Sequence, residues 1–362
     1  MATAERRVAR TLSAAVIAES GKEADVARKT LGVALVGVGA AAQINHIPAL
    51  KKTDGVELIA LVDRDPEKAA RVAQKFGVPH SFGRIEQMLE RDDVDAVDLC
   101  TPNFLHAPMA IASLESGKHV LCERPLARNA DEAAAMCSAA KKADRVLMSA
   151  VQHRFRADAQ LLRTFTSKGE LGEIHYAKAG WLRRRTEWDS DEWRQQKRES
   201  GGGVVLDLGF QMLDLSLWTL GSPRVTSVTA SVHRTKPGDV EDSATAFLRL
   251  ETGATLTLEL TWGLLMEKDF AYLNLFGSGG AALLNPFRLH KGMHGTLVNV
   301  TPDLDNARNQ YKQSMEAQIF HFVESLKKGG KTMGSAEEIL PVMETLDAVY
   351  RSAEQGKEIR LA

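Results

Sequence analysis

The stretch Leu31–Leu50, LGVALVGVGAAAQINHIPAL, constrains the fold of this chain more than any other. Residues 31–36 form a short apolar run with β-branched residues, which is typical of a strand buried on both faces of a parallel sheet. Gly37, Gly39 and Ala42 follow in the spacing G-x-G-x-x-A, which permits a tight turn, the approach of a pyrophosphate and close packing of the next helix. The N-terminus of that helix offers free N–H groups to phosphates. The stretch therefore predicts the first strand, turn and helix of a dinucleotide-binding unit.

A second apolar run, Val56–Val62, ends in Asp63, which lies 21 residues after Ala42. This spacing is close to the roughly 20 residues expected for the carboxylate that binds the adenosine ribose hydroxyls. A carboxylate here favours NAD, because it would repel the 2′-phosphate of NADP. The neighbouring Arg64 could accommodate that phosphate, so NADP stays open as the less favoured cofactor.

The pattern of the chain changes near residue 150. From residue 31 to 150, strand-like runs alternate with helical segments, which predicts βαβ units and a doubly wound parallel sheet of the Rossmann type. Residues 151–362 contain strand-like runs joined by turns and followed by two helices, which predicts an α+β domain for substrate binding and oligomerisation. A length of 362 residues suits two domains.

Residues 1–30 carry an arginine pair before a short apolar stretch, Thr11–Ala18, a pattern that can indicate a twin-arginine export signal. The apolar part is short and acidic residues flank it. Apolar residues also recur at intervals of four, which favours an amphipathic helical extension. We therefore expect a cytoplasmic protein.

Composition excludes several classes of partner and site. The net charge of −1 gives no reason to expect nucleic acid or an anionic membrane as a partner, and no apolar run reaches the ~18 to 20 residues that cross a bilayer. Cys100, Cys122 and Cys137 include no C-x-x-C pair, so neither a disulfide framework nor a zinc knuckle is expected. His290 and His294 lie among glycines that indicate a loop, with no third ligand evident, and we assign no metal.

Five segments together resemble the Gfo/Idh/MocA oxidoreductases, namely LVGVGAAAQINH, ALVDRDPEKA, CTPNFLH, GKHVLCERPLA and SGGGVVLDLGFQMLDLSLWTLG. The resemblance runs from about residue 31 to the end. It implies a Rossmann domain followed by a domain with a large open mixed sheet. It also implies hydride transfer to or from the nicotinamide of NAD(P) with a sugar, inositol or related polyol. Homo-oligomers, dimers or tetramers, are implied as well, because a broad uncovered sheet face is an interaction surface.

The resemblance, with the spacing argument, assigns a set of residues to the cofactor. Ligands of doubly wound sheets bind outside the carboxyl ends of the strands, where the loops TPNFLH and ERPL lie. Trp193 and Arg194 match a W-R pair that reaches the cofactor in some members of the family; a solvated loop arginine is the alternative. The predicted cofactor site comprises Gly37, Gly39, Ala42, Asp63, Arg64, Thr101, Asn103, Leu105, His106, Glu123, Arg124, Pro125, Trp193 and Arg194.

Two departures from the family pattern affect the predicted proton relay. Arg124 replaces the lysine of the family's E-K-P motif, and Gln211 replaces the histidine of its D-x-G-x-H motif. The resemblance gives that lysine and histidine the handling of the substrate proton, but arginine stays protonated and glutamine does not titrate. Asp207, one helical turn before Gln211, is the titratable group that remains. Either Asp207 or an ordered water handles the proton, or Asp207 forms a structural ion pair with Arg124.

Arginine and aromatic residues are dense near the expected substrate pocket. Guanidinium groups suit carboxylates and phosphates, so an anionic substrate such as a uronate, sugar acid or sugar phosphate is one possibility. Solvated arginines balanced by acidic residues 187, 189 and 191 are the alternative. The predicted substrate residues are Arg154, Trp181, Arg183, Asp207 and Gln211, and the predicted catalytic residues are Arg124, Asp207 and Gln211.

The sequence thus favours an NAD-dependent oxidoreductase on a sugar, polyol or related hydroxy compound, with an atypical proton relay. Two alternatives stay open. The first is a family member that binds the dinucleotide without turnover, as a regulatory or structural subunit. The second is a lyase or glycosidase that uses NAD for transient oxidation.

Overall fold

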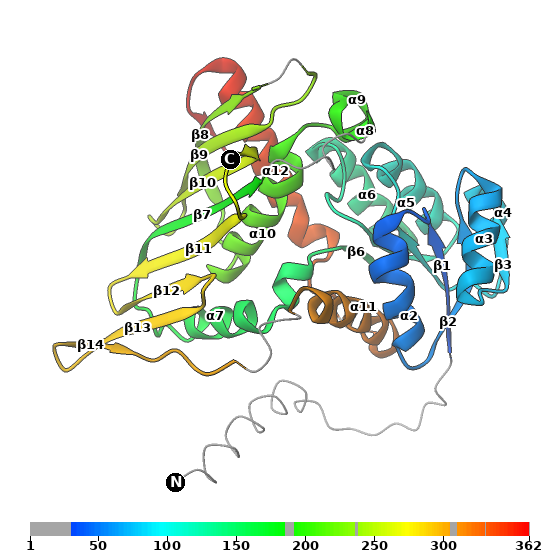
Figure 1. Cartoon of the computed structure of the whole chain (residues 1–362), viewed down its shortest axis with the longest axis horizontal. Helices are drawn as coiled ribbons and strands as arrows, with labels where there is room; N and C mark the ends of the chain where they lie inside the picture. The colour runs from blue at the N-terminus through cyan, green and yellow to red at the C-terminus, as the bar shows by residue number, and fades with distance from the viewer. Residues whose placement is uncertain (1–29, 185–191, 236–237, 305–309, 330, 362) are drawn as a thin grey trace, which may run out of the picture. The chain divides into compact units, whose positions relative to one another are not determined.

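The computed structural model describes residues 30–184, 192–235, 238–304, 310–329 and 331–361. Two β-sheets organise these residues, each with helices packed against it (Figure 1). The helical extension predicted for residues 1–30 lies outside the described residues, except for Thr30.

The first sheet is the doubly wound parallel sheet that the sequence predicts. Its order is β3-β2-β1-β4-β5-β6 and all its pairs are parallel. The strands are β1 (Leu31–Val36), β2 (Val56–Val62), β3 (His80–Phe82), β4 (Ala96–Leu99), β5 (His119–Cys122) and β6 (Leu147–Ser149). The helices between them are α2 (Ile47–Lys52), α3 (Pro66–Phe76), α4 (Ile85–Leu89), α5 (His106–Glu115) and α6 (Ala130–Ala143).

Local sequence signals account for the bounds of α3. The side chain of Asp65 accepts a hydrogen bond from the Lys68 N–H at 2.9 Å, and Pro66 occupies the first helical position. Gly77 ends the helix with a φ of 64°. These residues fix where the chain leaves β2, and hence where Asp63 lies.

The second sheet has nine strands in the order β14-β13-β12-β11-β7-β10-β9-β8-β15. β7 pairs in parallel with β10 and antiparallel with β11, so the sheet is mixed, as the resemblance implies. Its strands are β7 (Ile174–Arg184), β8 (Val225–His233), β9 (Ser243–Leu250), β10 (Thr255–Leu264), β11 (Phe270–Gly277), β12 (Gly280–Leu284), β13 (Arg288–Met293), β14 (Thr296–Asn299) and β15 (Ile359–Arg360). His290 lies in β13, so the prediction of a loop there is wrong.

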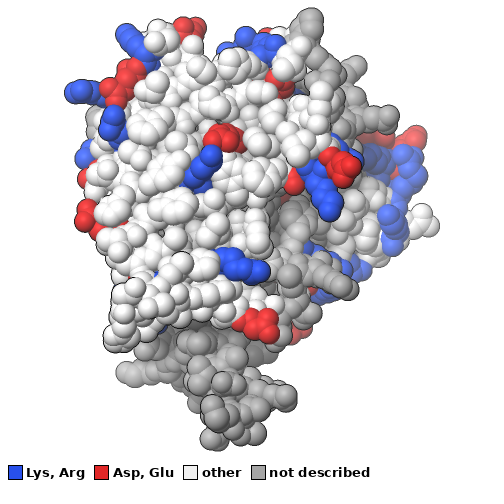
Figure 2. Space-filling view, turned by 60° about the vertical axis from the view of Figure 1, so that its left-hand side comes forward, with Lys and Arg blue, Asp and Glu red and all other residues white. Residues whose placement is uncertain are grey.

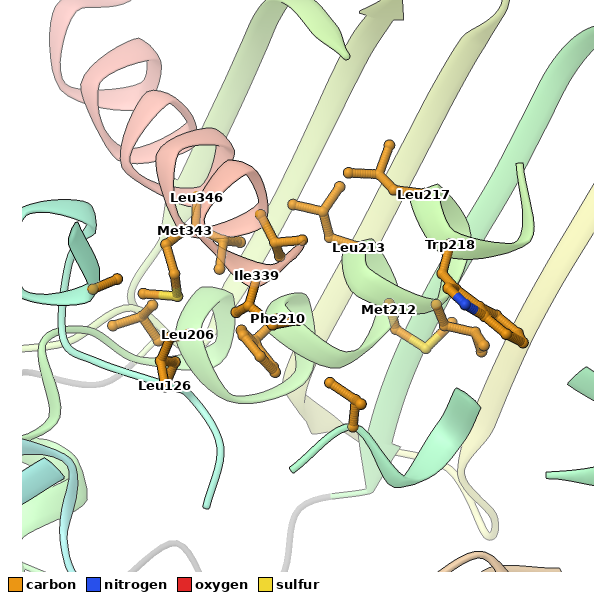
Figure 3. Close-up of a cluster of buried hydrophobic side chains, with 14 of the residues drawn as sticks. Leu126, Leu206, Phe210, Met212, Leu213, Leu217, Trp218, Ile339, Met343 and Leu346 are labelled. Atoms are coloured by element: carbon orange, nitrogen blue, oxygen red, sulfur yellow. The ribbon is translucent and has the colours of Figure 1, made fainter. Parts of the chain in front are cut away.

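Helices cover one face of the second sheet: α7 (Ala157–Ser167), α10 (Phe210–Thr219) and α12 (Ala336–Gln355). Every residue of α10 is buried, as expected for a helix enclosed on all sides. Leu213 and Phe210 of α10 pack with Ile339 and Met343 of α12 in the core (Figure 3). This packing holds the start of α10, and the residues just before it, in a fixed place.

Helix α11 (Gln310–Lys328) returns to the first sheet. Its residues Ile319, Phe322 and Val323 share a hydrophobic cluster with Val33 and Leu35 of β1. The late helix therefore packs beside the segment that follows the glycine turn. Among the described helices, none combines the length and apolarity that would let it cross a membrane.

Candidate active site

The glycine turn after β1 is closed on one side and open on the other. Gly37 has a φ of 92°, and a Cβ there would lie 2.6 Å from the Cys100 carbonyl oxygen, so only glycine fits. A Cβ on Gly39 would meet nothing within 4 Å. Ala42 is fully buried at the start of a π-helical turn, η1 (Ala42–His46). The open side at Gly39 provides the close backbone approach that a pyrophosphate requires.

Asp63 lies beside this turn, at the carboxyl end of β2. Its Oδ2 accepts hydrogen bonds from the Val38 N–H at 3.0 Å and from Lys68 Nζ at 3.1 Å. Its Oδ1 accepts from the Asp65 N–H at 3.1 Å. Arg64 is exposed. Lys68 is a second cation beside Asp63, the carboxylate predicted to bind the ribose, and the sequence analysis did not identify it. Its only signal in the sequence is its position in the first turn of α3.

The loop after β4 is tied by hydrogen bonds to two other segments of the chain. Asn103, in η2 (Asn103–Leu105), donates its Nδ2 to the Ser200 carbonyl at 2.8 Å. The ring nitrogens of buried His106 lie 2.8 Å and 2.9 Å from the carbonyl oxygens of Pro125 and Thr101. Burial lowers the pKa of His106. A neutral ring has one N–H, so His106 donates to one of these two carbonyl oxygens, and it lies between the two loops predicted to line the nicotinamide.

Thr101 and Leu105 lie in the same loop, and neither is exposed. The buried Thr101 hydroxyl has no hydrogen-bond partner among the described residues. An unpartnered buried hydroxyl is costly unless a ligand or water satisfies it. Together with the open side of the turn and the fixed carboxylate of Asp63, it shows that the residues present fit a dinucleotide.

A buried histidine that the sequence reasoning missed supports the loop after β5. His46, at the end of η1, places Nδ1 2.8 Å from Asp98 Oδ2 and Nε2 2.9 Å from Glu123 Oε1. Burial disfavours the imidazolium, but the Asp98 carboxylate outweighs it and raises the pKa of His46 well above its usual value. Glu123 Oε2 in turn accepts from the Arg124 N–H at 2.9 Å. His46 and Arg124 overcome burial and lower the pKa of Glu123 to about 2.

His46, Asp98 and Cys100 bring potential metal ligands within 4.8 Å of one another. Burial and the Asp98 carboxylate raise the pKa of Cys100 to about 12, which keeps its thiol protonated. Both ring nitrogens of His46 are already bonded to carboxylates. We therefore assign no metal to this group.

The predicted partners Arg124 and Asp207 are in contact and join the two sheets. Arg124 Nη1 lies 2.5 Å from Asp207 Oδ1. Asp207 lies in a π-helical turn, η5 (Val205–Gly209), and its Oδ2 accepts from Trp262 Nε1 at 2.9 Å and lies 3.4 Å from Arg183 Nη1. The Arg124 and Arg183 cations outweigh burial and hold the pKa of Asp207 below its usual value. Asp207 is therefore ionised and weakly basic.

Gln211 is buried and fully engaged one turn after Asp207. Its Nε2 donates to the Asp207 carbonyl oxygen at 3.1 Å. Its Oε1 accepts from Gln152 Nε2 at 3.1 Å and lies 3.0 Å from His153 Nε2. Gln152 and His153 belong to a 3-10 turn, η3 (Gln152–Phe155), that follows β6. His153 therefore lies beside Gln211, the position at which the family pattern has a histidine.

Two predicted substrate residues lie on β7 near this group. The ring of Trp181 meets the ring of His153 edge-on at 5.7 Å, and its buried Nε1 has no partner among the described residues. The Arg183 guanidinium lies 5.7 Å from the centre of the Trp262 ring. The acidic residues 187, 189 and 191, weighed as partners of these arginines, lie outside the described residues.

The structure gives Arg154 a different setting from the one predicted. It is 2% exposed, and its Nη2 lies 2.6 Å from Asp214 Oδ1. Its Nη1 lies 2.6 Å from Glu338 Oε2. These pairs tie η3 to α10 and α12, so a substrate could reach the guanidinium only by breaking them. We correct the prediction accordingly: Arg154 is an internal ion-pair residue.

Trp193 and Arg194 lie in α8 (Glu192–Gln195), with the Arg194 guanidinium 4.5 Å from the centre of the Trp193 ring. The next helix, α9 (Lys197–Ser200), contains the Ser200 carbonyl that accepts from Asn103. The pair is thus close along the chain to a segment that contacts the loop after β4. Its contact with a cofactor stays a prediction.

Comparison with known proteins supports this picture. A model described as the oxidoreductase family with an NAD-binding Rossmann fold matches residues 31–151, and a model of the GFO/IDH/MocA C-terminal domain matches residues 159–283. Fold and matches together define an NAD-binding oxidoreductase built on a Rossmann sheet and a second mixed sheet. The chain belongs to the Gfo/Idh/MocA family, which confirms the resemblance seen in the sequence and the expectation of an NAD(P)-linked oxidoreductase.

Two relatives and two structures illustrate the similarity. D-glucoside 3-dehydrogenase of Escherichia coli is 31% identical over 351 residues, covering 91% of this chain and 97% of the relative. D-xylose 1-dehydrogenase (NADP+) 2 of Haloferax volcanii is 29% identical, and the match covers 91% of this chain and 98% of the relative. An oxidoreductase domain protein from Kribbella flavida superposes with a TM-score of 0.84 at 26% identity, covering 92% and 100%. Levoglucosan dehydrogenase with NADH and levoglucosan shares the fold, with a TM-score of 0.83 at 23% identity, covering 91% and 99%.

Proposed function

We propose that this protein oxidises a hydroxyl group of a sugar, polyol or related compound with NAD, or reduces the corresponding carbonyl. The contact between Arg124 and Asp207 carries the proposal, because it joins the loop after β5 of the NAD-binding sheet to η5, a turn that packs against β10 of the second sheet. A fixed cation and an ionised carboxylate thus meet beside the dinucleotide residues. Relatives named for D-glucoside, D-xylose and D-apiose support a carbohydrate as substrate.

The cofactor residues follow from the turn and its neighbours. When bound, NAD supplies the acceptor for a hydride at its nicotinamide ring. The backbone at Gly37 and Gly39 and the start of η1 would hold the pyrophosphate, and Asp63 would bind the ribose hydroxyls. Asp63 favours NAD, whereas Arg64 and Lys68 supply cations that a 2′-phosphate would attract.

Arg124 and Asp207 would orient the substrate. The guanidinium of Arg124 has five N–H donors, of which Nη1 contacts Asp207, so other donors remain for hydroxyl oxygens. Arg124 cannot accept a proton, and Asp207 is a weak base because two arginines hold it ionised. We therefore assign both residues to positioning and charge stabilisation, which sets this site apart from the lysine and histidine pattern of the family.

Calorimetric titration with NAD and NADP, followed by absorbance assays of NADH formation with a panel of aldoses, glucosides, uronates and polyols, tests the proposal. We expect tighter binding of NAD and turnover of at least one carbohydrate. Binding of NAD without turnover on any of them would support a regulatory or structural member of the family, which the lack of a strong base at Arg124 and Gln211 also favours. Elimination or glycoside cleavage without net NADH would support the lyase or glycosidase alternative.

We also propose that the protein forms homo-oligomers through the uncovered face of the second sheet. In β9, buried residues alternate with the outward-facing Thr245, Phe247 and Arg249, and Phe247 is 37% exposed. The side of the molecule that carries this sheet shows few charged side chains over a broad surface (Figure 2). Light scattering should show a dimer or tetramer at tens of micromolar, and Phe247→Arg should shift it towards monomer; a monomeric wild type would refute the proposal.

The division into residues 1–30, 31–150 and 151–362, and a cytoplasmic location, are also proposals. Their support is the change of pattern along the sequence. Deleting residues 1–30 should leave NAD affinity unchanged, and a fluorescent fusion of the whole chain should distribute through the cytoplasm. Export of the fusion, or loss of NAD binding on deletion, would contradict them.

A further inference from the structure

We propose that the substrate carries a carboxylate, as in a uronate or an aldonate, and that one edge of the Arg124 guanidinium binds it. The inference deepens the proposed function and rests on it, because it names the class of carbohydrate that the site takes. It rests also on the contacts of Arg124 and on the charges that act on nearby His153.

One edge of the Arg124 guanidinium is open. Its hydrogen bonds to described residues all come from Nη1, which donates to Asp207 Oδ1 at 2.5 Å and to the Asp207 carbonyl oxygen at 3.4 Å. Nε and Nη2 form no hydrogen bond with a described residue, and neither is among the buried atoms that lack a partner. The side chain is 26% exposed. A ligand can therefore reach Nε and Nη2 while Nη1 keeps its bond to Asp207.

The chemistry of this edge suits a carboxylate. Nε–H and one N–H of Nη2 point the same way from the planar group, so two carboxylate oxygens can accept from them side by side. A lysine, which the family pattern has at this position, is a point charge without such an edge. The second N–H of Nη2 remains for a hydroxyl oxygen of the same molecule, an arrangement that fits a hydroxy acid.

The carboxylates of Asp207 and Glu123, both beside Arg124, have their oxygens engaged elsewhere. Asp207 Oδ1 accepts from Nη1, and Asp207 Oδ2 accepts from Trp262 Nε1 at 2.9 Å. Glu123 Oε1 bonds to His46, and Glu123 Oε2 accepts from the Arg124 backbone N–H. Neither carboxylate can turn to the edge formed by Nε and Nη2 without breaking these bonds, so that edge is left for a ligand.

The charges near Arg124 favour an anion. Burial lowers the pKa of His153 to about 3, and the Arg156 and Arg124 cations act in the same direction. The ring bonds to the Gln211 amide, and no described carboxylate bonds to it. Its surroundings thus disfavour a cation, in part because two arginines already supply positive charge there. The same positive charge attracts a carboxylate.

The first test measures binding without turnover. Calorimetric titrations use the whole protein loaded with NADH and two matched pairs, D-gluconate with D-glucitol and methyl glucuronide with methyl glucoside, none of which carries a ketone or aldehyde for NADH to reduce. We expect the acid of at least one pair to bind roughly tenfold to hundredfold more tightly, the range for hydrogen bonds to a charged group. Equal or undetectable binding within both pairs would overturn the inference, and so would tighter binding of glucose 6-phosphate than of either acid.

A variant separates the edge of the guanidinium from its charge. Arg124→Lys keeps the cation but loses the edge, so the advantage of the acid should fall below about threefold. Arg288→Lys, at an exposed position in β13, is the matched control and should bind as wild type does. An Arg124→Lys protein that keeps both the full preference and the wild-type melting temperature would show that the acid binds elsewhere, which overturns the inference.

Turnover separates this inference from the proposed function. Oxidation of each acid and its neutral partner by NAD is followed by absorbance, and we expect kcat/KM to favour the acid by a similar factor, through KM rather than kcat. Equal kcat/KM within a pair that is oxidised overturns the inference and leaves the proposed function standing. Tighter binding of the acids with no oxidation of any carbohydrate refutes the proposed function, while the carboxylate site at Arg124 stands.

Discussion

The glycine turn and the group that joins the two sheets are built in different ways. The turn depends on backbone shape: Gly37 lies against the Cys100 carbonyl, and the side of Gly39 is open. The joining group depends on side chains from separate segments, with Arg124 from the loop after β5, Asp207 from η5 and His153 from η3. The spacing of the glycines makes such a turn visible in the sequence, whereas contacts among side chains from separate segments leave no local pattern there. The dinucleotide side therefore keeps the family pattern and the proton side departs from it.

The largest effect that sharpens this contrast concerns the two departures from the family pattern. Arg124→Lys with Gln211→His should restore the lysine and histidine of that pattern. We expect turnover of a carbohydrate substrate to rise by about a hundredfold or more, because general acid–base catalysis contributes at least this much. Steady-state assays measure it, and a double variant as slow as wild type would show that these two positions do not carry the proton relay in this chain.

Two glycine substitutions test the backbone side. Gly37→Ala should destabilise the protein by about 3 kcal/mol or more, because its φ is 92° and the new Cβ would overlap the Cys100 carbonyl. Gly39→Ala should leave the unfolding free energy within about 0.5 kcal/mol of wild type but weaken NAD binding by roughly tenfold, equivalent to about 1.4 kcal/mol. Urea unfolding and calorimetry separate the two. A stable Gly37→Ala protein would mean that the turn is not closed as described.

Asp63 should show an intermediate effect. Asp63→Ala removes hydrogen bonds to a charged group, so NAD affinity should fall by roughly 1.5 to 3 kcal/mol. NADP affinity should rise relative to NAD, since Arg64 and Lys68 would remain. Competition calorimetry gives both values. An unchanged NAD affinity would place the ribose elsewhere.

A further effect, which depends on pH, concerns the stability of the fold. The pKa of Glu123 is about 2 in the folded protein, below its usual value of 4.5, so its charge stabilises the fold above pH 4.5, and this contribution is lost as pH falls towards 2. Glu123→Gln should be less stable than wild type near neutral pH, and the difference should shrink in acid. Urea unfolding at several pH values measures it. A difference that is constant down to pH 3 would contradict the bonds of Glu123 to His46 and Arg124.

The sequence predicts the features that have short-range signals. The turn at Gly37, the strand ending in Asp63 and the bounds of α3 follow from spacing, caps and apolar runs. The contact of Arg124 with Asp207 also follows, because the family pattern relates these two distant positions.

Features that depend on side chains far apart in the chain could not be predicted in this way. The setting of Arg154 depends on Asp214 and Glu338, which lie 60 and 184 residues away. The link from Asp98 through His46 to Glu123 likewise spans three elements. A lone histidine or aspartate in an apolar run carries no sign of its partner, so only the folded chain shows it.

A crystal structure of the protein with NAD and a carbohydrate that it turns over tests the central claim most directly. The account predicts a substrate hydroxyl within hydrogen-bonding distance of the Arg124 guanidinium, beside its contact with Asp207. The carbon bearing that hydroxyl should lie roughly 3 to 3.5 Å from the reacting atom of the nicotinamide, the separation of a near-attack geometry. A carbohydrate bound away from the contact of Arg124 with Asp207 would contradict it.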